Sequence, residues 1–217
     1  MDDLAPLQKI VVWALPVLFA ITVHEVAHGW VAKQLGDRTA MMLGRLTLNP
    51  IKHIDPIGTL LVPGIMILFG GVVFGWAKPV PVTWQNLHNP KRDMALVALA
   101  GPMSNLIMAV LWVMIMKVSL LLPGSMAMIV RPLLYMGAAG ITINLILMVL
   151  NLVPIPPLDG SRIVSSFLPD KLAWRYNQFE QYGFLLLLIL LATGMLQHII
   201  GPPLSLMQAL IFRIAGL

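Results

Sequence analysis

Cysteine is absent from the 217 residues of this sequence, and charged residues make up only 11% of it. Without cysteine the chain can form neither a disulfide framework nor a thiolate metal site, so any metal must be held by His, Asp or Glu. A soluble domain carries about 25% charged residues, whereas this chain is 59% hydrophobic. These proportions exclude a disordered chain and a typical soluble enzyme, and they indicate a polytopic membrane protein.

The net charge of +5 does not indicate a nucleic-acid-binding protein. The 14 Lys and Arg residues are scattered between long apolar runs, and this distribution is typical of membrane orientation. We therefore expect a lipid bilayer, and no nucleic acid, among the partners. A cleavable signal peptide is not expected either, because Asp2 and Asp3 precede a single Lys9 where a basic region would stand.

Six apolar runs divide the chain, at about 10–33, 57–77, 94–122, 128–153, 182–200 and, more weakly, 203–217. A membrane-spanning helix needs about 20 apolar residues. All but the second and the last are therefore predicted to span, which gives an all-α polytopic membrane protein with three core helices and a C-terminal helix. The run 203–217 is too short to predict a span, and we expect it in the membrane interface.

The basic residues predict the orientation of these helices. Segment 33–55 holds four Lys or Arg residues and segment 78–92 holds three, which places both in the cytoplasm by the positive-inside rule. The apolar stretch 57–77 between them must then enter and leave by the same face. Its glycines and Pro63 favour a re-entrant or surface-lying segment, and a hairpin of two short passes is the alternative.

Residues 24–28 read His-Glu-Val-Ala-His. On a helix, His24 and His28 lie on one face, separated by a rise of about 6 Å. Both imidazoles can then reach one Zn²⁺ at roughly 2.0–2.1 Å, while Glu25 can accept the proton of an activated water. The alternative is a polar cluster that stabilises helix packing. An ionisable residue in a spanning helix costs several kcal/mol, however, and therefore indicates a function.

A catalytic zinc needs a third protein ligand and an open position. The candidates are the other histidines and several carboxylates: His53, His88, His198, Asp55, Asp93, Asp159, Asp170 and Glu180. Asp159 follows three prolines, within 154–157, that cannot continue the preceding helix, so it is expected on irregular backbone at about the depth of the motif histidines. From local sequence alone, a turn or helix-cap aspartate is an equally open interpretation.

Two motifs together resemble the site-2 protease family of intramembrane zinc metalloproteases: His24-Glu25-x-x-His28, and Asn151-x-x-Pro-x-Pro-x-Leu-Asp159-Gly160. Residues 100–105, Ala-Gly-Pro-Met-Ser-Asn, resemble the middle-helix motif of that family, and 44–50 and 75–81 resemble its compact bacterial branch, which lacks a PDZ domain. The resemblance implies a single membrane domain over 1–217. Its protease core would cover about 10–160, with accessory C-terminal helices at about 181–217.

The resemblance also implies the roles of the site residues. His24, His28 and Asp159 would bind one Zn²⁺ per chain, and Glu25 would be the general base. Asn151 would lie near the metal, where its amide could donate to a developing oxyanion. Helix packing is the alternative for Asn151, and it is the favoured interpretation for Asn105, although Asn105 completes the middle-helix motif.

Hydrolysis of a peptide bond in or near the transmembrane segment of a membrane protein is the activity that the resemblance implies, within regulated intramembrane proteolysis. The expected partner is a single-span membrane protein, and no oligomeric state is indicated. The expected location is the bacterial inner membrane, with the active site toward the cytoplasm. Residues 45–49 and 79–83 are extended candidates for holding an unwound substrate by strand addition, with a plain loop as the alternative.

Two other functions are open from the sequence. A divalent-metal transporter would use the same His, Glu and Asp residues as a transport site, but such proteins commonly contain paired inverted repeats, and no second copy of the His-Glu unit is visible. A proteolytically inactive relative that binds membrane helices is the third interpretation. It is disfavoured because all four key positions are filled.

Overall fold

The computed structural model describes residues 5–62, 65 and 75–216, and this part of the chain consists of helices and connecting segments without a strand. The helices are, in chain order, α1 (Pro6–Gln34), α2 (Thr39–Met42), α4 (Pro90–Leu120), α5 (Ala127–Leu152), α6 (Asp159–Phe167), α7 (Asp170–Gln178), α8 (Glu180–Ala192) and α9 (Met195–Ala215). Single helical turns lie between them at η1 (Pro50–His53), η2 (Pro56–Leu61), η3 (Trp84–Asn86) and η4 (Gly124–Met126).

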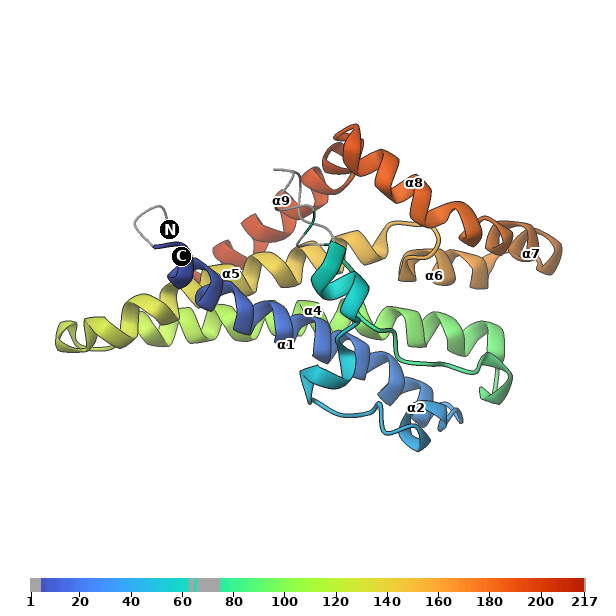
Figure 1. Ribbon diagram of the computed structural model, residues 1–217, viewed down its shortest axis with the longest axis horizontal. Helices are drawn as coiled ribbons and strands as arrows, with labels where there is room; N and C mark the ends of the chain where they lie inside the picture. Colours follow the sequence, from blue (N-terminus) through green and yellow to red (C-terminus); the bar gives the residue numbers. More distant parts are fainter. Residues whose placement is uncertain (1–4, 63–64, 66–74, 217) are drawn as a thin grey trace.

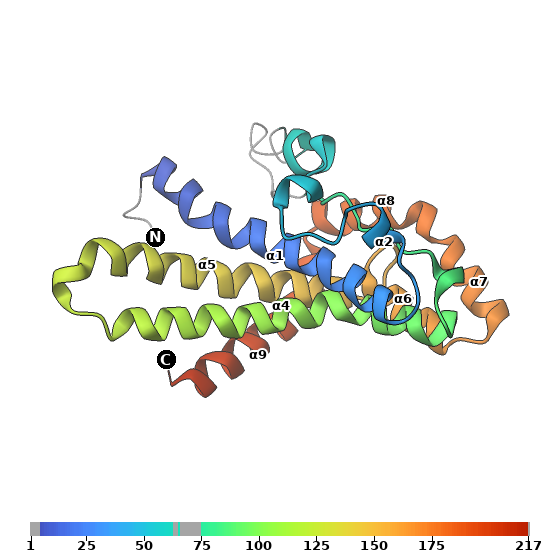
Figure 2. The ribbon, with the colours of Figure 1, turned by 90° about the horizontal axis from the view of Figure 1, so that it is seen from below.

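Three long helices, α1, α4 and α5, run side by side along the longest axis of the molecule (Figures 1 and 2). Each is long and apolar enough to cross a membrane, which confirms the predicted spans 10–33, 94–122 and 128–153. Each also contains an interior proline, which spanning helices tolerate because neighbouring groups satisfy the freed carbonyl. The chain is therefore an integral membrane protein.

The C-terminal part of the chain corrects the prediction of one span at 182–200. Helix α8 ends at Ala192, and Gly194 adopts a left-handed φ of 74° that only glycine adopts easily. A separate helix, α9, then covers 21 residues and is long enough to span. Most of the run 203–217, expected in the membrane interface, therefore belongs to a helix that is long and apolar enough to span. Pro202 and Pro203 lie inside α9.

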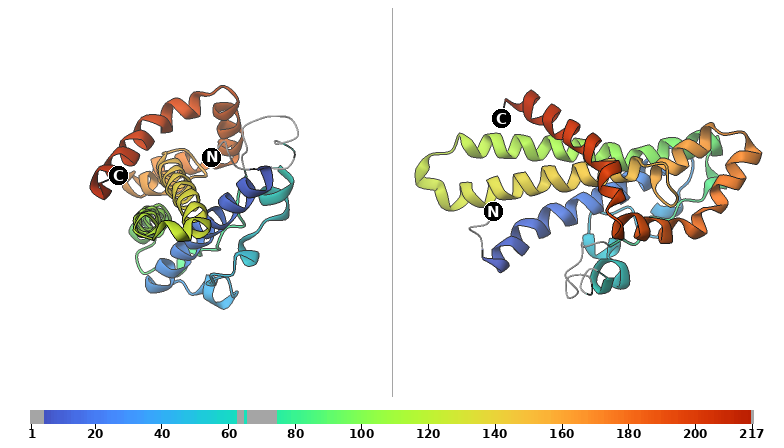
Figure 3. Two further views of the ribbon diagram at one scale, coloured as in Figure 1. Left: turned by 90° about the vertical axis from the view of Figure 1, so that its left-hand side faces the viewer. Right: turned by 90° about the horizontal axis from the view of Figure 1, so that it is seen from above.

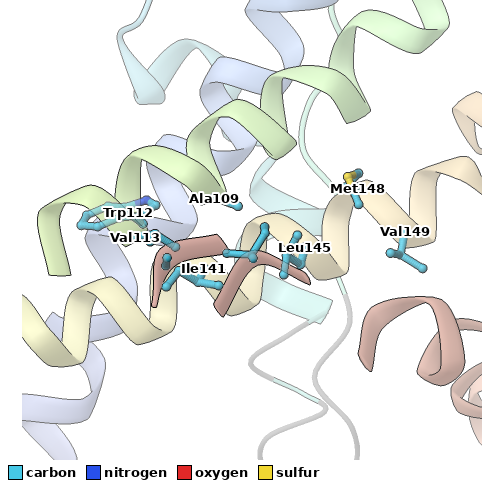
Figure 4. Packing of buried hydrophobic residues seen from close by; sticks show 9 residues of the cluster. Ala109, Trp112, Val113, Ile141, Leu145, Met148 and Val149 are labelled. Carbon is cyan, nitrogen blue, oxygen red and sulfur yellow. The ribbon is translucent and has the colours of Figure 1, made fainter. Parts of the chain in front are cut away.

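The core lies between α4 and α5, with α9 packed against both (Figures 3 and 4). Its buried residues are Ala109, Trp112, Val113, Ile141, Leu145, Met148, Val149, Ile211 and Ala215. Gly140 of α5 lies directly under the Trp112 ring, where a Cβ atom would overlap the indole. Small residues at such contacts allow membrane helices to approach closely, since packing rather than the hydrophobic effect holds them together in lipid.

One end of this bundle gathers the segments that build the site. The C-terminus of α1, the N-terminus of α4 and the C-terminus of α5 meet there, together with α6 and α7 (Figure 2). An ion pair between Lys91 Nζ and Asp170 Oδ1, 2.9 Å long, joins α4 to α7 at the surface and lowers the pKa of the exposed Asp170 carboxyl. We call this end of the molecule the site end.

The predicted re-entrant segment 57–77 falls largely on residues 63–64 and 66–74, which lie outside the described residues, so re-entrant segment and hairpin are not distinguished. Residues 45–49 and 79–83 form no strand in the part of the chain that is described, and the plain-loop interpretation fits both. The second of these loops nevertheless has a fixed position against α1, as the site geometry shows.

Candidate metal centre

Three side-chain atoms converge inside the bundle at the site end. His24 and His28 face the same direction from successive turns of α1, and their Nε2 atoms are 3.0 Å apart. Asp159, the first residue of α6, places Oδ2 3.2 Å from His24 Nε2 and 3.3 Å from His28 Nε2. Among the described residues, these three form a group that could hold a metal ion.

The protonation of the two histidines follows from their other ring nitrogens. His28 Nδ1 lies 2.7 Å from the backbone carbonyl of Val97, and a carbonyl can only accept, so Nδ1 donates. His24 Nδ1 lies 2.6 Å from Asn105 Oδ1 and donates to it in the same way. In a neutral imidazole, the Nε2 atom then carries a lone pair and no hydrogen.

The residues present therefore fit a cation. Two Nε2 lone pairs face a carboxylate oxygen, Asp159 Oδ2, which is buried and accepts no hydrogen bond. Three such groups repel one another unless a positive charge lies between them. Tetrahedral zinc bonds of 2.0–2.1 Å place ligand atoms about 3.3 Å apart, close to the observed separations of 3.0, 3.2 and 3.3 Å.

Asn105 orients His24 from helix α4. Its amide nitrogen donates to the Ala20 carbonyl at 3.2 Å and to Asn144 Oδ1 at 3.0 Å, and both asparagines are fully buried. The amide of Asn105 is thereby fixed with its oxygen toward His24. Both hydrogen bonds use the amide NH₂ group, which is the group that would have to donate to an oxyanion. Asn105 therefore contacts the outer edge of the His24 imidazole, on the side away from the candidate metal position.

Helix α4 can supply these contacts because Gly101 has no side chain. A Cβ atom at Gly101 would overlap His28 Nε2, and it would lie 2.6 Å from His24 Cε1. The close approach brings the Val97 carbonyl and the Asn105 amide to the outer edges of the two imidazoles. Gly101 is therefore a point of close contact between α1 and α4.

The irregular backbone that carries Asp159 is held from outside by α7 and α8. Helix α5 ends at Leu152, as the prolines within 154–157 require. The hydroxyl of Tyr176 donates to the Pro154 carbonyl at 2.6 Å. Gly183 of α8 packs against the Pro156 carbonyl so closely that a Cβ atom would overlap it. These contacts fix the segment that presents Asp159 to the histidines.

Glu25 stands next to His24 on α1 and is half-buried. Its Oε2 accepts a hydrogen bond of 2.7 Å from the backbone amide of Val80. Among the described residues, the structure gives no partner to its other oxygen. A carboxylate with one oxygen fixed and the other open, beside a metal centre, has the arrangement of a general base.

The other candidate residues have local roles. Asn151 donates to the Leu147 carbonyl of its own helix at 3.0 Å, so its predicted oxyanion role stays a prediction. His53, one of the candidates for the third ligand, is 2% exposed and bonds to the Thr47 carbonyl, so it has a local role. Asp55 and Asp93 accept hydrogen bonds from nearby backbone amides.

The sequence reasoning missed Asp37 and Val80. Asp37 is completely buried and binds residues of the loop that contains Val80. One signal was present, since an aspartate directly after a helix-ending glycine and two residues before Thr39 is typical of a side chain that bonds to local backbone. That signal gives no indication of the distant partners.

Comparison with known proteins gives a consistent result. The chain matches the model of peptidase family M50 over residues 12–136 and 122–192. A protein of Bacillus subtilis (strain 168) named "Putative zinc metalloprotease YwhC" is 38% identical over 205 residues, which cover 92% of this chain and 89% of the relative. No solved structure matches the chain significantly.

Two mycobacterial proteins bear the same description with the name Rip2. The one from Mycolicibacterium smegmatis is 31% identical over 201 residues, covering 91% of this chain and 74% of the relative. The one from Mycobacterium tuberculosis (strain H37Rv) is 30% identical over 174 residues, covering 80% of this chain and 63% of the relative.

Replacing Asn105 tests the orienting contact. In Asn105→Ala, His24 Nδ1 loses its acceptor, and we expect the affinity for zinc to fall about 10- to 100-fold, measured by competition with a chromophoric chelator. Ser104→Ala is the matched control, because the Ser104 hydroxyl bonds only within its own helix, to the Gly101 carbonyl. Wild-type zinc affinity in Asn105→Ala would show that the contact does not orient the ligand.

Proposed function

Because this chain belongs to peptidase family M50 and is therefore a zinc metalloprotease of the membrane, we propose that it hydrolyses a peptide bond in or near the transmembrane segment of a single-span membrane protein. We further propose that this cleavage is a step of regulated intramembrane proteolysis. The observation that carries the proposal is the position of the metal centre. Two of its three ligands lie within the spanning helix α1.

The depth of the centre supports cleavage within the bilayer. His24 is ten residues from the C-terminal end of α1 at Gln34, which corresponds to about 15 Å of helix rise. The side chains of His24, His28 and Asp159 are only 9%, 11% and 14% exposed. A peptide bond that reaches these residues must therefore come from a segment that enters the membrane.

Each residue of the centre has a defined task in the proposed reaction. His24, His28 and Asp159 would hold one zinc ion, which when bound supplies Lewis-acid activation of the scissile carbonyl and of the attacking water. Glu25 accepts the proton of that water with its free oxygen and passes it to the leaving amine. Asn151, the penultimate residue of α5 and eight residues before Asp159, stays our candidate for a donor to the developing oxyanion.

We also propose that the site end faces the cytoplasm of a bacterial cell, in the inner membrane. The basic residues are distributed unequally between the two ends of the bundle. Ten of the 14 lie in segments 33–55, 78–92 and 160–180, that is, at or after the end of α1, before or at the start of α4, and in α6 and α7: Lys33, Arg38, Arg45, Lys52, Lys78, Lys91, Arg92, Arg162, Lys171 and Arg175. Short loops rich in Lys and Arg stay on the cytoplasmic side during insertion.

A transport function is less well supported than proteolysis. The family match and the relatives named as zinc metalloproteases favour the protease over the divalent-metal transporter considered from the sequence. Moreover, Glu25 is not among the residues whose ligand atoms converge, whereas the transporter interpretation would use it as part of the transport site. A separate base beside a three-ligand centre is the arrangement of a hydrolase.

Glu25→Gln tests the proposed reaction. The amide cannot accept a proton, so we expect cleavage of single-span substrate helices in detergent or liposomes to fall by at least about 100-fold, while about one zinc per chain stays bound. Glu180→Gln is the matched control, since Glu180 is the only other glutamate and lies exposed at the start of α8. Undiminished cleavage by Glu25→Gln, or zinc loss in it, would contradict the proposed role of Glu25.

Single cysteines test the proposed orientation without background, because the chain contains none. Lys171→Cys lies at the site end, and Met128→Cys lies at the opposite end, where Met128 is 92% exposed. We expect a membrane-impermeant maleimide to label Lys171→Cys in inverted membrane vesicles and Met128→Cys in right-side-out vesicles. The reverse pattern would show that the site end faces away from the cytoplasm.

A further inference from the structure

A connecting segment that ends in the helical turn η3 links the proposed general base to a buried carboxylate far from the metal. This segment, residues 79–86, is here called the brace segment. At one end, the backbone amide of Val80 donates to Glu25 Oε2 at 2.7 Å. At the other end, the backbone and side chains of the segment bind Asp37, which is 0% exposed and follows the C-terminus of α1.

The side chain of Val80 is seated on α1 directly beside the base. Val80 is 7% exposed, and a Cβ atom at Gly29 would lie 2.9 Å from its Cγ1 atom. Gly29 is four residues after Glu25, so both positions lie on the same face of the helix, one turn apart. The missing side chain of Gly29 thus creates the space in which Val80 approaches, and its amide meets the carboxylate.

Asp37 accepts hydrogen bonds at both carboxylate oxygens. Oδ1 accepts from the Thr39 amide at 3.0 Å, from the Thr39 hydroxyl at 2.5 Å and from Asn86 Nδ2 at 3.1 Å. Oδ2 accepts from the Thr83 amide at 2.7 Å. The two bonds from the brace segment are thus made by the same buried carboxylate that closes the turn after α1.

This set of donors keeps the carboxylate charged. Burial by itself would raise the pKa of Asp37, but the hydrogen bonds from Thr39, Thr83 and Asn86 outweigh it and hold the pKa below its usual value. A buried carboxylate stays ionised only while such donors surround it. The negative charge of Asp37 and the position of the brace segment therefore depend on each other.

The distance along the chain between the two anchors is short. Thr83 is three positions after Val80, and three residue steps can span at most about 10–11 Å. Thr83 is bonded to Asp37, and Val80 packs on Gly29, so the Val80 amide has little freedom to move away from Glu25. Fixing one carboxylate oxygen of Glu25 in turn selects its rotamer and directs the other oxygen.

We propose that Asp37 is a positioning residue for the general base: it pins the brace segment, and the Val80 amide thereby holds the Glu25 carboxylate in the orientation that accepts the proton of water. This inference rests on the proposed function, because it assumes that Glu25 is the base. A base must be placed accurately for efficient proton transfer. Asp37 itself touches neither the metal ligands nor Glu25.

Asp37→Asn tests the proposal. In this variant an NH₂ group replaces one of the two carboxylate oxygens, so it faces N–H or O–H donors and cannot accept their hydrogen bonds. We expect kcat for cleavage of a single-span substrate to fall about 10- to 100-fold, with KM and the zinc content unchanged. We also expect hydrogen exchange at the Val80 and Thr83 amides to accelerate at least about 10-fold. The exchange readout does not depend on activity, so it tests the brace even if Glu25→Gln disproves the proposed base.

Asp170→Asn is the matched control, since it removes the same charge from an exposed pair with Lys91 and should leave kcat and both exchange rates unchanged. Gly29→Ala tests the Val80 contact itself, because the added methyl group would lie 2.9 Å from Val80 Cγ1, closer than to Ala40 or Leu46. It should lower kcat and accelerate exchange at the Val80 amide, and faster exchange there with kcat unchanged would overturn the proposal even if Asp37→Asn does not fold.

Two results would overturn the proposal. One is accelerated exchange at Val80 with kcat unchanged, which would show that the brace does not set the orientation of the base. The other is loss of zinc together with activity in Asp37→Asn, which would show that Asp37 supports the metal centre as a whole. A fall in kcat with zinc and KM preserved, accompanied by faster exchange at Val80, supports the positioning role.

Discussion

Three lone pairs meet at one point inside the helical bundle, and the rest of the structure depends on their convergence. His24 and His28 each donate their Nδ1 hydrogen to a fixed acceptor, so their Nε2 lone pairs and Asp159 Oδ2 face one another and fit a cation between them. Three helices bring these groups together. Helix α1 places the two histidines on one face, and α4 packs closely against them at Gly101. Helix α5 ends at Leu152, and the irregular segment after it places Asp159 beside the histidines.

Placing such groups at this depth is costly, because an unpaired polar group in the bilayer loses its hydration. In the structure, each of the two imidazoles has a hydrogen-bond partner on α4. Asn105 connects α1, α4 and, through Asn144, α5, while the Val97 carbonyl serves His28. The polar network therefore both orients the ligands and joins the helices, and the apolar core around Trp112 and Leu145 packs beside it (Figure 4).

The sequence predicted most strongly what is encoded locally. The spacing of His24, Glu25 and His28 identified the first half of the centre, and the length of the apolar runs predicted α1, α4 and α5 correctly. Asp159 was one of several candidates until the family resemblance singled it out, because its partners are more than 130 residues away. The division into α8 and α9 was missed because the apolar run 182–200 continues across Gly194, where α8 and α9 are separated. Asp37 and Val80 could not be found from the pattern, since their contacts link distant residues by backbone amides, which have no sequence signature.

The central claim is that His24, His28 and Asp159 form one zinc site inside the membrane-spanning bundle. X-ray absorption at the zinc edge on the purified, folded protein tests it most directly. The account predicts one zinc per chain, bound by two imidazole nitrogens at about 2.0–2.1 Å and by carboxylate oxygen, with the imidazole signal halved in His24→Ala or His28→Ala. A folded, zinc-supplied protein that holds no zinc, or that holds it without imidazole ligands, would contradict the account.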